Sequence, residues 1–166
     1  MRNARRVPSP NRDPRPAGCE LCLIVIHGIS LPPDEFGGPW IDRLFTNTLP
    51  PDEHPYFATI SQLQVSSHAL IRRDGDVVQY VPFHRRAWHA GASSYQGRER
   101  CNDFSIGIEL EGADDRPFEA VQYARLVPVL RALFARYPRL GGRGLAGGVV
   151  RGRGRTHHPR APGGGA

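Results

Sequence analysis

The run Leu21-Cys22-Leu23-Ile24-Val25-Ile26 is continuous, apolar and rich in branched side chains, and it ends abruptly at His27-Gly28. Runs of this length are typical of a strand that is buried on both faces of a sheet. A second stretch, Ser105-Ile106-Gly107-Ile108-Glu109-Leu110-Glu111, alternates instead, with apolar residues on one face and glycine or glutamate on the other. We therefore predict two strands, each carrying one side chain of chemical interest.

Two further strands and a short helix are predicted between these stretches. Residues 65–71 and 76–81 have strand composition, and Arg72-Arg73-Asp74-Gly75 joins them. Asp-Gly between two strand-like runs predicts a β-hairpin with a tight primed turn. Residues 40–46 fit a short helix, after a loop enforced by glycine and proline.

The clearest helix is predicted over residues 117–137, with Asp114 or Asp115 as its N-cap. Pro128 lies inside it and predicts a kink, because proline removes a helical hydrogen bond. One apolar stripe with helical spacing comprises Tyr123, Leu126, Val127, Leu130, Leu133, Phe134 and Tyr137. Strands interleaved with helices predict the α/β class, with a mixed sheet flanked by helices.

The two ends differ from the middle of the chain. Four prolines within residues 1–20 predict an extended, disordered leader, and residues 21–140 form the predicted domain. Residues 141–166 are rich in glycine and arginine without an apolar period, which predicts a disordered tail. The charge is +4 over residues 1–16 and +5 over 140–166, which leaves −3 of the total +6 in between.

These features exclude several classes of protein. No apolar run approaches the ~18 residues of a membrane span, and the leader lacks the apolar stretch of a signal peptide. We therefore expect a cytoplasmic monomer without a membrane partner. A nucleic-acid partner is not expected, since the basic residues lie in the ends without an aromatic platform. Cys19 and Cys22 have CxxC spacing, but no second pair follows, and packing is the simpler interpretation.

His27 and Glu109 are the candidate chemical residues. His27 ends the most apolar strand, where a scaffold presents side chains rigidly, and Glu109 lies opposite the isoleucines beside Gly107, which leaves room for a ligand. An imidazole and a carboxylate on neighbouring strands suit metal-assisted hydrolysis, in which the carboxylate takes a proton from water. A lone histidine at a strand end is, however, more often a hydrogen-bonded structural residue.

Trp88 and His89 form a second candidate pair, as a substrate wall or as a donor to a developing oxyanion. The alternative is a buried Trp-His pair with satisfied hydrogen bonds. The other histidines of this region, His54, His68 and His84, have no evident partner, and Glu111 and Asp103 fit surface or turn carboxylates better.

Several long motifs resemble one family closely. They include residues 4–10, 24–33 and 35–42, Arg86-Ala87-Trp88-His89-Ala90-Gly91, and residues 95–112. Through them the chain resembles the 1,6-anhydro-N-acetylmuramyl-L-alanine amidases of peptidoglycan recycling, the AmpD family. The resemblance implies a mixed-sheet fold shared with type 2 amidases and peptidoglycan recognition proteins, a Zn²⁺ cofactor, and an anhydro-muropeptide substrate. It implies that His27 is a zinc ligand and Glu109 the general base, with Trp88 and His89 near the substrate.

The resemblance stops at Leu145-Ala146-Gly147. Where the family has its second zinc histidine, its transition-state lysine and its zinc aspartate, this chain has Gly148, Thr156 and His158, and it contains no lysine. His157 or His158 is a candidate substitute ligand, since imidazole binds zinc. We hypothesise a reading-frame change after Gly147. The sequence thus predicts a zinc amidase with impaired activity or, alternatively, a non-catalytic muropeptide-binding protein.

Overall fold

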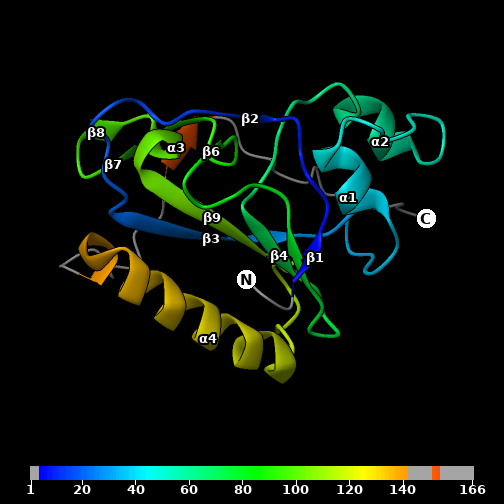
Figure 1. Cartoon of the computed structure of the whole chain (residues 1–166). Helices are drawn as coiled ribbons and strands as arrows, with labels where there is room; N and C mark the ends of the chain where they lie inside the picture. The colour runs from blue at the N-terminus through cyan, green and yellow to red at the C-terminus, as the bar shows by residue number, and fades with distance from the viewer. Residues whose placement is uncertain (1–3, 142–150, 154–166) are drawn as a thin grey trace.

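The computed structural model describes residues 4–141 and 151–153, which form a mixed sheet flanked by helices (Figure 1). The main sheet has five strands in the order β1-β5-β4-β9-β3, with parallel pairs β1–β5, β4–β9 and β9–β3 and the antiparallel pair β4–β5. The predicted fold class is therefore confirmed. The strands are β1 (Arg5–Arg6), β5 (Val77–Gln79), β4 (Ala69–Ile71), β9 (Ser105–Glu111) and β3 (Leu23–Ile29).

Smaller elements surround this sheet. Two small sheets have the strand orders β2-β6 and β10-β7-β8. Their strands are β2 (Arg12–Asp13), β6 (Arg86–Ala87), β7 (Ala92–Tyr95), β8 (Arg98–Glu99) and β10 (Arg151–Arg153). The helices are α1 (Trp40–Phe45), α2 (Pro55–Ile60), α3 (Cys101–Phe104), α4 (Ala120–Arg136) and the 3₁₀ turn η1 (Pro138–Gly141). None of the described helices is long and apolar enough to cross a membrane.

Strand β9 lies between β4 and β3, and all of its residues are buried. The prediction that residues 21–26 are buried on both faces was wrong. β3 is the last strand of the sheet, and the side chain of Ile26 is 43% exposed. Continuous apolar character does not distinguish a central strand from an edge strand, because both can pack one face fully.

The two faces of the sheet have different partners. Helix α4 lies along one face, where Ile106, Ile108 and Leu110 pack against its Leu126 and Leu133. The opposite face of β9 carries Ser105, Gly107, Glu109 and Glu111. Helices α1 and α2 cover one part of that face, and α3 with the β7 region covers another (Figure 1). The polar positions of β9 thus lie between two apolar clusters.

The β4–β5 hairpin is confirmed, but its turn is not a primed one. The amide of Gly75 donates to the carbonyl of Arg72, and the amide of Arg72 donates to the carbonyl of Asp76. Only Gly75 has a positive φ, of 85°, whereas a type I′ turn needs two such residues. The connection therefore matches a turn followed by a left-handed glycine bulge.

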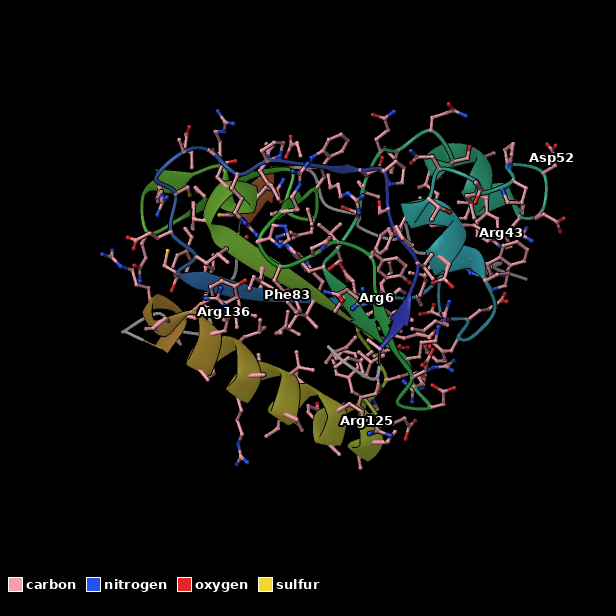
Figure 2. All side chains as sticks on the ribbon, viewed as in Figure 1. Arg6, Arg43, Asp52, Phe83, Arg125 and Arg136 are labelled. Carbon is pink, nitrogen blue, oxygen red and sulfur yellow. The ribbon has the colours of Figure 1, made fainter. Side chains whose placement is uncertain are left out.

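Helix α4 is confirmed, and it continues through Pro128. Its N-cap is Glu119 rather than Asp114 or Asp115, because Glu119 and Gln122 form a reciprocal capping box. The predicted stripe is buried only in part: the side chains of Tyr123 and Val127 are 51% and 46% exposed. In Figure 2, side chains of α4 lie between the helix and the sheet, with Arg125 in its second turn and Arg136 at its last residue.

The leader is extended as predicted, but residues 4–20 are held against the domain, contrary to the predicted disorder. β1 pairs with β5, β2 pairs with β6, and Ser9 and Asn11 are buried. Prolines exclude regular helix, yet they permit this edge pairing. Most of the predicted tail, 141–166, lies outside the described residues. Within the tail, Arg151–Arg153 are described, and they form β10, which pairs with β7.

Candidate functional site

His27 and Glu109 lie side by side. They occupy paired positions in the parallel register of β3 and β9, so their side chains project from the same face of the sheet. Neighbouring strands are about 4.8 Å apart, which places an imidazole beside a carboxylate. This juxtaposition, expected from two separate stretches of sequence, is the centre of the candidate site.

Glu109 is almost completely buried, with 6% of its surface exposed. Burial raises the pKa of its carboxyl group, because the charged form loses hydration, while the charge of nearby His27 opposes this shift. On β4, Leu70 is its register partner. A carboxyl group whose pKa is raised binds a proton more readily than an exposed glutamate, which suits a group that takes up and returns a proton.

His89 completes the cluster from a different part of the chain. It follows β6, and its Nδ1 lies 2.9 Å from Nε2 of His27, with the rings edge to face. A Cβ atom on Gly107 would lie 2.4 Å from Cγ of His89. The space that the glycine leaves is therefore filled by the His89 ring, which corrects the prediction that Gly107 makes room for a ligand.

Residues of α3 and β9 hold His89 in place. The side-chain carbonyl of Asn102 accepts hydrogen bonds from the amides of His89 and Ala90. Nε2 of His89 lies 3.1 Å from Oγ of Ser105, which donates to the carbonyl of Cys101. The pKa of His89 is well below its ordinary value, chiefly because of burial and also because of the basic groups around it. The ring is therefore neutral at pH 7.

His68 lies behind this cluster and is fully buried. Its Nδ1 accepts from the amide of Gly107, and its Nε2 lies 3.1 Å from the carbonyl of Arg85 and 3.0 Å from the guanidinium of Arg15. Burial, assisted by Arg15, lowers the pKa of His68 to about 3. Its hydrogen bonds are satisfied, which agrees with a structural role.

Trp88 is half-buried and is fixed through its backbone, which exchanges hydrogen bonds with Ser66. Its ring nitrogen is buried and has no hydrogen-bond partner among the described residues. Its predicted place in a substrate wall stays a prediction.

The prediction that Glu111 is a surface carboxylate was wrong. Glu111 is 2% exposed, and it accepts from the amides of Gly37 and Arg73 and from the guanidinium of Arg72. It ties the loop before α1 to the hairpin. Asp103 pairs with Arg86 and Arg100 and is likewise structural.

The supporting residues Ser105, Asn102 and Arg15 were not predicted from the sequence. No local sequence pattern marks these three residues as functional, because most of their hydrogen-bond partners are distant in the chain. Gly107 was the one available sign, as a glycine inside a strand often marks a close approach.

Candidate metal ligands are few in the described part of the chain. Residues 4–141 and 151–153 contain no group of three histidine, cysteine or acidic side chains that could hold a metal ion. His27 is the one predicted zinc ligand that lies at the site. Gly148, Thr156, His157 and His158 lie outside the described residues.

Comparison with known proteins identifies close relatives. The chain is 64% identical over 138 residues to the 1,6-anhydro-N-acetylmuramyl-L-alanine amidase AmpD of Citrobacter freundii, covering 83% of this chain and 74% of the relative. It is 64% identical to that of Escherichia coli over 135 residues, or 81% of this chain and 74% of the relative.

The structural comparison agrees. The crystal structure of a selenomethionine AmpD derivative has a TM-score of 0.83 at 63% identity, over 85% of this chain and 79% of that chain. The solution structure of Citrobacter freundii AmpD has a TM-score of 0.60 at 64% identity, over 84% and 75%. A sequence model of the family described as N-acetylmuramoyl-L-alanine amidase matches residues 20–161. The chain thus belongs to the N-acetylmuramoyl-L-alanine amidase family.

Proposed function

We propose that this chain hydrolyses the amide bond between 1,6-anhydro-N-acetylmuramic acid and L-alanine in muropeptides released during peptidoglycan recycling. The observation that carries this proposal is the 64% identity to AmpD amidases over more than 80% of the chain, together with a His27–Glu109 pair in register at the site. A cytoplasmic location and a monomeric state remain expectations from the sequence.

Glu109 is the proposed general base. Its carboxylate accepts a proton from the water that attacks the amide carbonyl, and it then returns this proton to the nitrogen of the leaving L-alanine. The burial that raises the pKa of Glu109 supports this assignment, because a base works best when its pKa is near the working pH. Trp88 and His89 are proposed to border the muropeptide.

Zinc is the cofactor that family membership implies, and a catalytic zinc normally has three protein ligands. The described residues do not fit such a site, since no three ligands come together among them. The sequence has Gly148 where the family has its second histidine. We therefore propose that this chain hydrolyses its substrate more slowly than the AmpD relatives do.

The test is to incubate the purified full chain with anhydro-muramyl-tripeptide, with and without added Zn²⁺, and to measure both released peptide and bound zinc. We expect slow release of peptide with a free L-alanine amino group. Glu109→Gln should reduce this rate at least ~10²-fold, as loss of a general base typically does. Glu99→Gln, at an exposed position on β8, is the matched control and should keep the wild-type rate.

Muropeptide binding without turnover under every metal condition would contradict the proposal. That outcome would support the non-catalytic muropeptide-binding protein, which the comparisons themselves do not favour.

A further inference from the structure

Four groups from three parts of the chain form a continuous series of hydrogen bonds. Nε2 of His27 lies 2.9 Å from Nδ1 of His89, Nε2 of His89 lies 3.1 Å from Oγ of Ser105, and Oγ of Ser105 lies 2.5 Å from the carbonyl oxygen of Cys101. Three of these groups, the two imidazoles and the hydroxyl, can either donate or accept. Only the carbonyl oxygen has a fixed role, because it carries no hydrogen.

The fixed end determines the direction of the whole series. The carbonyl of Cys101 can only accept, so the hydroxyl hydrogen of Ser105 points to it. Oγ of Ser105 must then accept from Nε2–H of His89. A neutral imidazole has one N–H, so Nδ1 of His89 has a free lone pair and accepts from Nε2–H of His27. In a neutral His27 ring, Nδ1 is left with the lone pair.

We propose that Ser105 is a positioning residue: through His89 it fixes the tautomer of His27, so that His27 presents the lone pair of Nδ1 to the site. This assignment extends the proposed function, which identifies the site that His27 serves. It also specifies the chemistry of what His27 can bind there. The partner must be an acceptor of an electron pair or a hydrogen-bond donor, and it must approach Nδ1 rather than Nε2.

The surroundings make this arrangement rigid. Ser105 is completely buried, and its hydroxyl bonds to the residue that begins α3. Asn102, in the same helix, holds the backbone of His89 by two hydrogen bonds. Gly107 leaves just enough space for the His89 ring, so the ring cannot shift toward β9. Orientation of a functional histidine by the partner of its other nitrogen is a general feature of such sites.

Ring-nitrogen NMR of the ¹⁵N-labelled, metal-free full chain at pH 7.5 tests the proposal. In the wild type, we expect protonated Nε2 and unprotonated Nδ1 for both His27 and His89. In Ser105→Ala, His89 loses its acceptor, and its ring signals should show a mixture of tautomers, with a parallel change at His27. Ser105→Thr keeps the hydroxyl group and should restore the wild-type pattern.

Two results would overturn the proposal. One is a protonated Nδ1 on His89 or His27 in the wild type, which needs no variant and so does not depend on how the variants fold. The other is an unchanged tautomer pattern in Ser105→Ala with a native backbone amide spectrum. Neither result depends on turnover, so a chain that hydrolyses nothing would contradict the proposed function and leave this assignment intact.

Discussion

At the scale of single residues, His68 makes the stability of the fold sensitive to acid. Its folded pKa of about 3 is below the ordinary value of 6.5. Between these two values the unfolded chain binds a proton on this ring and the folded chain does not. The stability that His68 contributes is therefore complete above pH 6.5 and is lost as the pH falls toward 3.

We expect His68→Gln to lessen this acid sensitivity. Between pH 6 and pH 4, its free energy of unfolding should fall less steeply than that of the wild type, by up to about 1.4 kcal/mol per pH unit. Urea unfolding at several pH values measures the slope. The exposed His84, changed to glutamine, is the control and should keep the wild-type slope. A wild-type slope in His68→Gln would refute the assignment.

Gly107 leads to a second prediction at this scale. In Gly107→Ala, the new methyl group would lie 2.4 Å from the His89 ring, so the ring must move away from His27 and Ser105. We expect a loss of about 1–3 kcal/mol in unfolding free energy, as for other overpacked cores, and loss of any turnover. Gly28→Ala meets only Phe118 at 3.7 Å and is the control. Equal stability of the two variants would show that the His89 ring is not confined.

At this scale the sequence predicted His27 and Glu109, because a histidine after an apolar run and a glutamate opposite isoleucines are visible locally. It did not predict Ser105 or Asn102. Their importance arises from contacts with His89, which only the folded chain brings near them.

At the scale of elements, the β4–β5 hairpin depends on one glycine and on its contact with α4. Gly75 has a φ of 85°, and a Cβ atom there would lie 2.6 Å from Val121 of α4. The turn thus packs directly on the first turn of α4. This contact links two elements that the sequence predicted separately.

Gly75→Ala should therefore lower the free energy of unfolding by more than the ~1–2 kcal/mol that an alanine in the left-handed conformation costs. Gly97 has a φ of 77°, and a methyl group added there would have no atom within 4 Å, so Gly97→Ala is the matched control for backbone strain alone. Gly75→Ala should lose more free energy of unfolding than Gly97→Ala, because of the clash. The double variant Gly75→Ala/Val121→Ala should regain this extra loss, because the clash is removed. Chemical denaturation of these three variants and of Val121→Ala checks this; additive losses in the double variant would exclude the proposed clash.

Most elements were predictable from local pattern. Alternation identified β9, an Asp-Gly pair identified the hairpin, and helical spacing identified α4. The N-cap of α4 was not predictable, because the position of Gln122 in the capping box depends on buried groups from other strands. Its side-chain amide donates to the carbonyls of Ile71 and Glu111.

At the scale of the whole molecule, the leader is part of the fold. The guanidinium of Arg15 donates to the carbonyls of Asn102, Asp103, Phe83 and Ser105 and thereby joins the leader to α3 and the start of β9. Burial lowers the pKa of Arg15 to about 10, and the group remains charged at neutral pH. The loss of hydration is offset by these hydrogen bonds.

Arg15→Met should lower the free energy of unfolding by about 3 kcal/mol or more, because hydrogen bonds to a charged group contribute about 1.5–3 kcal/mol each and several carbonyls lose their donor. Arg6→Met, in the same leader at an exposed position (Figure 2), is the control and should change stability by less than about 0.5 kcal/mol. Urea denaturation measures both. If both variants match the wild type, the leader does not contribute to the stability of the domain.

By itself, the sequence determined the class of fold, the strands that carry His27 and Glu109, and the motifs of an amidase family, because periodicity and motif are local properties of a chain. Only the tertiary structure decided that β3 is an edge strand, that the leader is packed, and that Ser105 and His89 adjoin His27. Each of these depends on which distant segments become neighbours, and the free energy of that choice comes from burial and hydrogen bonds that no single segment contains.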